Sequence, residues 1–173
     1  GEIAVRIIRS LRELGIKSVA IYSTADRDSL HVQLADEAVC VGGSRPQDSY
    51  LNMQNILAAA IGTGAQAIHP GFGFLSENAA FAEMCEACGI VFIGPKALTI
   101  DLMGNKEHAR EQMKKSGIPV IPGSDGYLSN VESAKQAAAA IGYPVLLKAA
   151  AGGGGKGIRR IENQNQMQQA FDE

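Results

Sequence analysis

A run of glycines near the C-terminal end is the clearest chemical signal in the sequence. Gly152, Gly153, Gly154 and Gly155 are consecutive, and Lys156 and Gly157 follow them directly. Backbone N–H groups of such a run can approach an anion closely because no Cβ stands in the way, and the flanking lysine adds positive charge. We therefore expect a phosphate-binding loop that acts as a mobile lid over a polyphosphate.

Spacing tests two familiar glycine motifs against this loop. A P-loop needs Ser or Thr directly after its Gly-Lys pair, whereas Gly157 stands there. Gly152, Gly154 and Gly157 match G-x-G-x-x-G, but in dinucleotide-binding folds that pattern opens a long helix. Here the short run 157–161 is followed by a polar Asn-Gln-Asn cluster. The pattern favours a strand, a glycine loop and a second strand, with a plain surface hairpin as the alternative.

Two more lysines could contact the same anion. Lys148 closes an otherwise apolar strand beside the glycine loop, where a charge is costly unless it meets an opposite charge. Lys106 opens a helix, where the helix dipole disfavours a cation. A bound anion would account for both positions.

The elements that must position these groups alternate between strand and helix. Helical patterns are expected at residues 2–14, 50–61, 78–87, 97–103, 106–116, 131–141 and 166–173, and strands at 18–22, 38–41, 65–68, 90–93 and from 145 onward. Ser49 is the expected cap of the helix that starts at Tyr50. Short connections between alternating elements predict an α/β fold, an open parallel sheet with helices on both faces.

Ligands on such sheets bind at the carboxyl ends of the strands, and residues 69–78 follow one of them. His69, at the start of this loop, is by itself more often a structural histidine than a catalytic one. Glu77, at its end, either stabilises the start of the next helix or belongs to the site. His69 and Glu77 are the candidate catalytic residues.

The order of elements predicts three parts. Residues 1–94 form a first domain that lacks its first strand, because the sequence opens inside a strand–helix unit. Residues 95–130 read as a connector, with a proline-rigid passage at 117–123. Residues 131–173 are the truncated beginning of a second domain.

Composition excludes several classes of protein. The formal net charge of −2 and the absence of a basic stripe argue against nucleic acid as a partner. No apolar run approaches the ~20 residues of a membrane span and no signal peptide is present, so a soluble, cytoplasmic protein is expected. Cys40, Cys85 and Cys88 lack a second pair for zinc and are expected to be reduced, buried or half-buried thiols. His31 has no ligand-spaced partner and is expected at the surface, and no metal site is expected.

Four segments together carry a resemblance to a known family. They are residues 1–4, the decapeptide 69–78, the pair 92–95 and 103–106, and the stretch 148–157. In order and spacing they resemble the biotin carboxylase family, within the ATP-grasp ligases. The decapeptide is the most specific segment. The resemblance covers all 173 residues but only the first part of the family's catalytic unit.

The resemblance implies a Rossmann-like first domain followed by the start of an ATP-grasp domain. It implies that ATP, with Mg²⁺, phosphorylates bicarbonate to carboxyphosphate, and that the carboxyl group passes to biotin on a carrier protein. By motif match, Lys106 and Lys148 would hold ATP phosphates and the loop 152–157 would close over them. The metal and bicarbonate ligands would lie beyond Glu173. A homodimer of the full-length protein would use the helix that carries Arg9 and Glu13.

This sequence departs from the family at two positions. Phe72 stands where the family usually has tyrosine, at a place that resembles the wall of the biotin pocket. Ile158 replaces a frequent methionine, a mild change in volume. Acetyl-CoA carboxylase of fatty acid biosynthesis is the example of a parent enzyme that the resemblance offers, and the acyl-CoA or keto acid that is finally carboxylated would be chosen by a carboxyltransferase partner. The alternatives are a non-catalytic nucleotide-binding or interaction fragment, and another ATP-grasp ligase.

Overall fold

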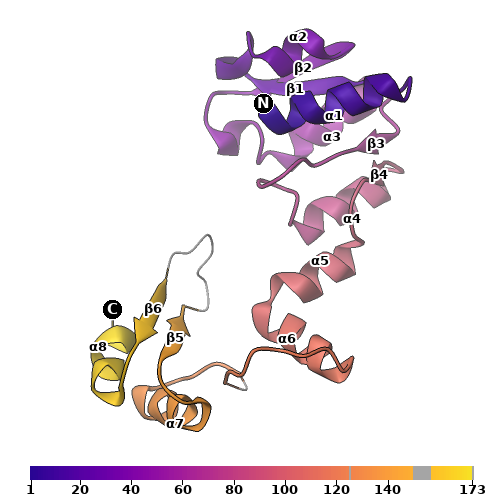
Figure 1. Cartoon of the computed structure of the whole chain (residues 1–173). Helices are drawn as coiled ribbons and strands as arrows, with labels where there is room; N and C mark the ends of the chain where they lie inside the picture. The colour runs from indigo at the N-terminus through magenta and orange to yellow at the C-terminus, as the bar shows by residue number, and fades with distance from the viewer. Residues whose placement is uncertain (125, 150–156, 173) are drawn as a thin grey trace. The chain divides into compact units, whose positions relative to one another are not determined.

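The computed structural model forms two compact units, Gly1–Asn105 and Lys106–Glu173 (Figure 1). It describes residues 1–124, 126–149 and 157–172, without the side chains of residues 106 and 107. Each unit has a hydrophobic cluster of its own. None of the helices in the described ranges has the length and hydropathy needed to cross a membrane.

The first unit alternates helices and strands, which confirms the predicted α/β class. Its α-helices are α1 (Glu2–Glu13), α2 (Leu30–Leu34), α3 (Met53–Gly62), α4 (Ala79–Ala87) and α5 (Ala97–Gly104). Its strands are β1 (Val19–Ser23), β2 (Glu37–Gly42), β3 (Ala67–Ile68) and β4 (Val91–Phe92). A short 3-10 helix, η1 (Thr24–Asp26), directly follows β1, and a second one, η2 (Pro46–Asp48), begins a few residues after β2.

The four strands are hydrogen-bonded as two parallel pairs. β1 pairs with β2, with Val19 opposite Glu37, and β3 pairs with β4, with Ile68 opposite Phe92. Helix α2 packs on β1 and α3 packs on β2. Because the pairs are parallel, the loops that follow β1 and β2 leave from the same end of their sheet, as do those that follow β3 and β4.

Helices α3 and α4 supply most of the core of the first unit. The buried cluster consists of Ile56, Leu57, Ala60, Leu75, Phe81, Cys85 and Ile90, and Ile21 of β1 and Phe92 of β4 pack against it. Phe81 meets Phe92 edge-to-face, with ring centroids 6.1 Å apart. The start of α4 is fixed by Asn78, whose Oδ1 accepts the N–H of Phe81 at 2.8 Å. The loop 69–78 therefore ends on a well-anchored helix.

The second unit contains helices α6 (Lys106–Lys115), α7 (Val131–Ile141) and α8 (Met167–Asp172), with η3 (Gln164–Gln166) preceding α8. Strands β5 (Val145–Lys148) and β6 (Ile158–Ile161) pair antiparallel, with Lys148 opposite Ile158. This pairing confirms the predicted hairpin on either side of the glycine loop. Its core contains Ala134, Ala138, Ile161 and Met167.

The expected cap of helix α3 was wrong. The helix begins at Met53 and its N-cap is Asn52, whose side chain accepts the N–H of Asn55 at 3.0 Å. Ser49 is instead completely buried, and its Oγ donates to the carbonyl of Arg45 at 2.9 Å. The physical reason is the 3-10 turn η2, which draws Ser49 inward before the α-helix starts.

Two expectations about exposure were also wrong. His31 is 4% exposed, because α2 packs on β1 and places its Nε2 3.3 Å from the carbonyl oxygen of Ile21. Cys85 is a buried free thiol as expected, but Cys40 and Cys88 are exposed. The lack of a ligand-spaced partner, on which the prediction for His31 rested, carries no information about burial.

Candidate functional site

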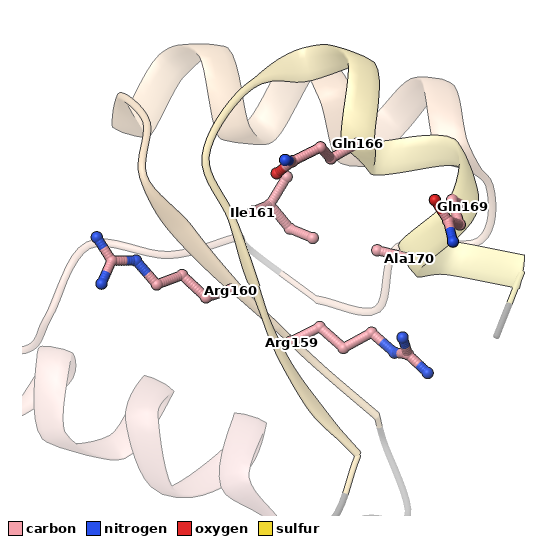
Figure 2. A pocket seen from close by; sticks show the side chains of 6 residues that line it. All are labelled: Arg159, Arg160, Ile161, Gln166, Gln169 and Ala170. Atoms are coloured by element: carbon pink, nitrogen blue, oxygen red, sulfur yellow. The ribbon is translucent and has the colours of Figure 1, made fainter.

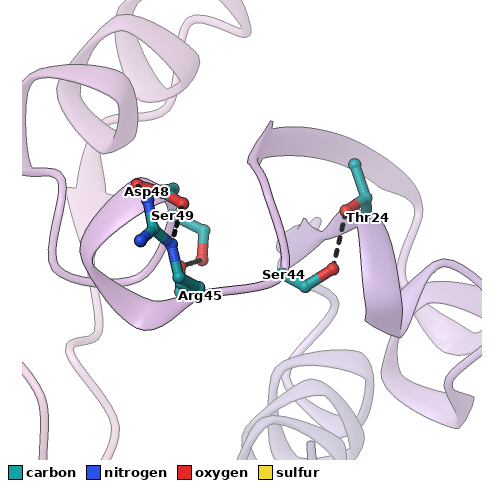
Figure 3. A network of polar contacts seen from close by, with 5 residues as sticks. All are labelled: Thr24, Ser44, Arg45, Asp48 and Ser49. Carbon is teal, nitrogen blue, oxygen red and sulfur yellow. Dashed lines mark hydrogen bonds and ion pairs between the residues drawn. The ribbon is translucent and has the colours of Figure 1, made fainter.

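Polar side chains gather where β1 and β2 end (Figure 3). The Oγ1 of Thr24, just after β1, lies 3.2 Å from the Oγ of Ser44, just after β2. Arg45 pairs with Asp48, with Nε 2.8 Å from Oδ2, and the carbonyl of Arg45 accepts the hydroxyl of Ser49. These bonds hold the loop after β2 next to the end of β1.

A second polar group at the end of β1 is built on Asp26. Its Oδ2 accepts the hydroxyl of Tyr50 at 2.6 Å and the hydroxyl of Ser23 at 2.7 Å. The backbone N–H of Ser23 in turn donates to the Tyr50 Oη at 2.9 Å. The hydrogen bonds from Tyr50 and Ser23 lower the pKa of Asp26 below its ordinary value of 3.8. Burial and the bond to Asp26 raise the pKa of Tyr50.

The lowered pKa of Asp26 predicts a pH dependence of stability. Because the folded-state pKa lies below 3.8, Asp26 contributes stability above that pH and loses it as the pH falls through the folded-state value. Asp26→Asn should lower the free energy of unfolding at neutral pH by about 1–2 kcal/mol, and the deficit should shrink in acid. Urea unfolding from pH 7 to about pH 3 measures this. Asp28→Asn, at an exposed neighbour, is the matched control; a deficit for Asp26→Asn that does not change with pH would contradict the prediction.

The loop 69–78 follows β3 and turns sharply. Gly71 and Gly73 have φ of +71° and +76°, and Phe74, which is not a glycine, has φ of +44°. The Nδ1 of His69 accepts the N–H of Gly71 at 3.1 Å. His69 is thus engaged in a local bond that shapes the turn.

The side chains of this loop divide into an anchored set and an exposed set. Leu75 is buried in the core, and the ring of Phe74, although 58% exposed, stacks on that of Tyr50, with centroids 5.4 Å apart and planes at 27°. Phe72 is 83% exposed, and His69 and Glu77 are exposed as well. The loop therefore presents Phe72 to solvent from a backbone that is held on both sides.

In the second unit, Lys148 lies at the end of β5 with an exposed side chain. The next residue closes the ladder, since the N–H of Ala149 donates to the carbonyl of Gly157 at 2.7 Å. The predicted phosphate loop residues Gly152, Gly153, Gly154, Gly155 and Lys156, and the side chain of Lys106, lie outside the described part of the chain. Their assignment to phosphate binding stays a prediction.

Gly157 closes this hairpin in a conformation that favours glycine. Its φ is +71°, and a Cβ built on it would lie 2.8 Å from the Cβ of Ala149. Gly157→Ala should weaken the base of the hairpin, because left-handed backbone costs about 1–2 kcal/mol for other residues and Ala149 must also move. The amide hydrogen of Ala149 should then exchange roughly 5- to 30-fold faster.

Gly117→Ala is the matched control for that change. Gly117 has the same φ of +71° in the same unit, but nothing lies within 4 Å of its built Cβ. The amide of Ala149 should keep its exchange rate in this variant. Equal acceleration in both variants would show that the contact with Ala149 has no part in closing the hairpin.

A shallow hollow of about 400 Å³ lies beside β6 and α8 (Figure 2). It is lined by Arg159, Arg160, Ile161, Gln166, Gln169 and Ala170. The side chains of Arg159 and Arg160 project away from each other in Figure 2, as expected for neighbours on a strand. Arg160 pairs with Glu162 at 2.9 Å. Lys148 is not among the lining residues, so the hollow does not supply the predicted phosphate contact.

A metal site was not expected before Glu173. Within the described ranges, no group of three or more His, Cys, Asp or Glu side chains is placed to hold a metal ion. Magnesium takes oxygen ligands, usually one or two carboxylates together with substrate phosphates. The described residues therefore offer no cluster that fits Mg²⁺.

Sequence reasoning missed the part that Tyr50 and Asp26 play in this region. The two residues are 24 positions apart and meet only through the fold. The one local signal was Ser23, three residues before Asp26 at the end of a strand, a spacing at which a serine hydroxyl reaches a carboxylate in a turn. The loop candidates His69, Phe72 and Glu77 belong to the first unit and Lys148 to the second.

The fold and these sites define an α/β protein with parallel strand pairs, followed by a unit of helices and an antiparallel hairpin around a glycine loop. The family model "Biotin carboxylase, N-terminal domain" matches residues 1–100, and "Carbamoyl-phosphate synthase L chain, ATP binding domain" matches residues 105–173. The chain belongs to the biotin carboxylase family.

Relatives and solved structures agree with this assignment. Biotin carboxylase 1 of Bacillus subtilis is 58% identical over 96% of this chain and 37% of its own length. The biotin carboxylase of Campylobacter jejuni, in a complex with β,γ-ATP, matches with a TM-score of 0.94 and 50% identity. The biotin carboxylase domain dimer of Hydrogenobacter thermophilus 2-oxoglutarate carboxylase, with MgADP, ADP and bicarbonate, matches with a TM-score of 0.91 and 52% identity. Both matches cover 99% of this chain and 38% of the other, so the chain spans well under half the length of these relatives.

Proposed function

We propose that this chain is the N-terminal part of an ATP-dependent biotin carboxylase. In this proposal ATP activates bicarbonate as carboxyphosphate, and the carboxyl group is transferred to biotin on a carrier protein. The observation that carries it is the agreement of 99% of the chain, at about half sequence identity, with biotin carboxylases solved with MgADP and bicarbonate or with an ATP ligand.

The proposal gives this chain's residues specific tasks. Lys148 and Lys106 hold ATP phosphates, and the loop 152–157 closes over them. Phosphoryl transfer depends mostly on positioning and on neutralising charge, which lysines and backbone N–H groups can supply. The side chain of Lys148, at the end of β5, is exposed, as this role requires. Magnesium, when bound with ATP, would neutralise phosphate charge through ligands outside the described residues.

Two further proposals concern the molecule that finally receives the carboxyl group and the oligomeric state of the full-length protein. One candidate for the full-length enzyme that contains this chain is the acetyl-CoA carboxylase of fatty acid biosynthesis. Relatives also include a 2-oxoglutarate carboxylase small subunit, 52% identical, and the biotin carboxylase subunit of pyruvate carboxylase, 56% identical. A carboxyltransferase partner would choose among acceptors. A homodimer of the full-length protein is in line with the dimer of the Hydrogenobacter thermophilus domain, and the use of α1 as its interface stays a prediction. The cytoplasmic location and the domain boundaries at 94 and 130 stay predictions.

The test is bicarbonate- and biotin-dependent ATP hydrolysis by a full-length protein that contains this chain, beside the 173-residue chain alone. We expect hydrolysis only by the longer protein, because apolar contact for adenine and carboxylates for the metal are needed for tight ATP binding. Comparable rates in both would place the catalytic centre within these residues. No biotin-dependent hydrolysis by either would favour the non-catalytic alternative.

Phe72 provides a test of the biotin site. Its ring is exposed on the loop 69–78, where the family usually has tyrosine. Phe72→Tyr in the full-length enzyme should lower the KM for free biotin by roughly 2- to 10-fold, the value of one added neutral hydrogen bond. The KM for ATP is the internal control and should not change. An unchanged KM for biotin would mean that a hydroxyl at this position has no role.

A further inference from the structure

Tyr50 connects two loops that follow different strand pairs. It lies between η2 and α3, and its hydroxyl donates to Asp26 at the end of β1. The face of its ring stacks on Phe74, in the loop after β3, at a centroid distance of 5.4 Å. One half-buried side chain therefore holds the loop 69–78 against the end of β1.

The direction of the Tyr50 ring is set by three hydrogen bonds. The phenol oxygen donates to Asp26 and accepts the backbone N–H of Ser23, and the Ser23 hydroxyl donates to the same Asp26 oxygen. A group that both donates and accepts at fixed positions has little rotational freedom. Ser23 is 1% exposed and belongs to β1. The hydrogen bond from its backbone N–H therefore ties the Tyr50 hydroxyl to the sheet itself.

Phe74 is the point at which this anchor acts on the loop. Its φ of +44° lies in a region that a bulky side chain rarely adopts, so the conformation must be held by contacts. Leu75 in the core provides one and the Tyr50 ring the other. Phe72, two residues earlier, is 83% exposed and makes no comparable packing contact among the described residues.

We propose that Tyr50 is a positioning residue for the biotin site: through Phe74 it sets the backbone that presents Phe72. The proposal rests on the proposed function, since it takes the exposed ring of Phe72 as part of the surface that meets biotin. Loss of the Tyr50 ring should disturb biotin and leave ATP, which is assigned to the second unit, unaffected.

The test uses steady-state kinetics of the full-length enzyme with free biotin as acceptor. Tyr50→Leu should raise the KM for biotin about fivefold, the value of one aromatic stack, with the KM for ATP unchanged. Tyr50→Phe keeps the ring that stacks on Phe74 but loses the hydroxyl that anchors it to Asp26 and Ser23, so its KM for biotin should lie between those of the wild type and Tyr50→Leu. Phe74→Leu should match Tyr50→Leu, and the double variant should be no worse than either, since both remove the same contact. Tyr127→Leu, at an exposed tyrosine of the second unit, is the control.

Several outcomes would overturn the proposal. They are equal changes in the two KM values, no recovery in Tyr50→Phe, or additive losses in the double variant. Hydrogen exchange of residues 71–74 in the same proteins reports, independently of activity, whether the stack of Tyr50 on Phe74 holds this loop. Faster exchange of these amides in Tyr50→Leu supports that role of Tyr50, and unchanged exchange refutes it. If the wild-type enzyme shows no biotin-dependent ATP hydrolysis, the proposed function is refuted. The exchange measurement would still decide whether Tyr50 holds the loop 69–78 in place.

Discussion

Lys148→Met in the full-length enzyme should lower kcat/KM for ATP by roughly 10- to 150-fold. A charge-assisted hydrogen bond is worth about 1.5–3 kcal/mol, and each 1.4 kcal/mol is a factor of ten. Lys148 is exposed at the end of β5, one residue before the bond that closes the hairpin, so its ammonium is available to a ligand beside the glycine loop. Methionine keeps most of the apolar stem of the side chain and removes the ammonium, with its charge and its three hydrogen-bond donors.

Controls separate this effect from damage to the hairpin. Lys148→Arg should retain much of the activity, because charge is kept while the donor geometry changes. Lys115→Met is the matched control on an exposed lysine, since its pair with Glu111 lies on the surface of α6 and is worth only a few tenths of a kcal/mol. Wild-type ATP kinetics in Lys148→Met would remove Lys148 from the phosphate site.

Phe81→Ala should lower the free energy of unfolding of the first unit by about 3–5 kcal/mol. Phe81 is 1% exposed, lies in the buried cluster between α3 and α4, and meets Phe92 edge-to-face. Its removal loses the buried apolar surface and leaves a cavity that Cys85 and Ile90 can fill only in part. A loss of this size is a large share of the 5–15 kcal/mol of a typical domain. The measurement is urea unfolding, followed by a signal that comes from the first unit.

Phe72→Ala is the matched control for that experiment. The same side chain is removed, but from a position that is 83% exposed, so the free energy of unfolding should change by less than about 0.5 kcal/mol. Phe81→Leu should fall between the two because it leaves a smaller cavity. Similar losses for Phe72→Ala and Phe81→Ala would contradict the assignment of the core.

The alternation of elements could be predicted from sequence because each element carries its own signal. An apolar stripe at helical spacing and a cap such as Asn78 lie within a few residues of one another. The hairpin around the glycine loop was predictable in the same way, from an apolar run before the loop and a short run after it that a polar cluster cuts off. Lys148 was singled out because a charge ending an apolar strand is a local anomaly.

Tertiary structure alone decided how these elements meet. The burial of His31 follows from the packing of α2 on β1, and the inward turn of Ser49 from the 3-10 turn before it. A periodic pattern reports which face of one element is apolar, and it is silent on which other element covers that face. The same holds for the pairing of the strands into two parallel pairs.

The loop 69–78 shows most clearly the difference between what the sequence predicts and what the tertiary structure decides. Its sequence predicted a glycine-containing loop after a strand and placed an aromatic residue at position 72, whereas the sharp turn and the exposure of Phe72 came from the structure. The contact of Phe74 with Tyr50, and of Tyr50 with Asp26, was decided by the fold, because these residues are 24 positions apart in both pairs. Backbone preferences act over a few residues, whereas stacking and hydrogen bonding between distant side chains exist only once packing has brought the sheet end and both loops together.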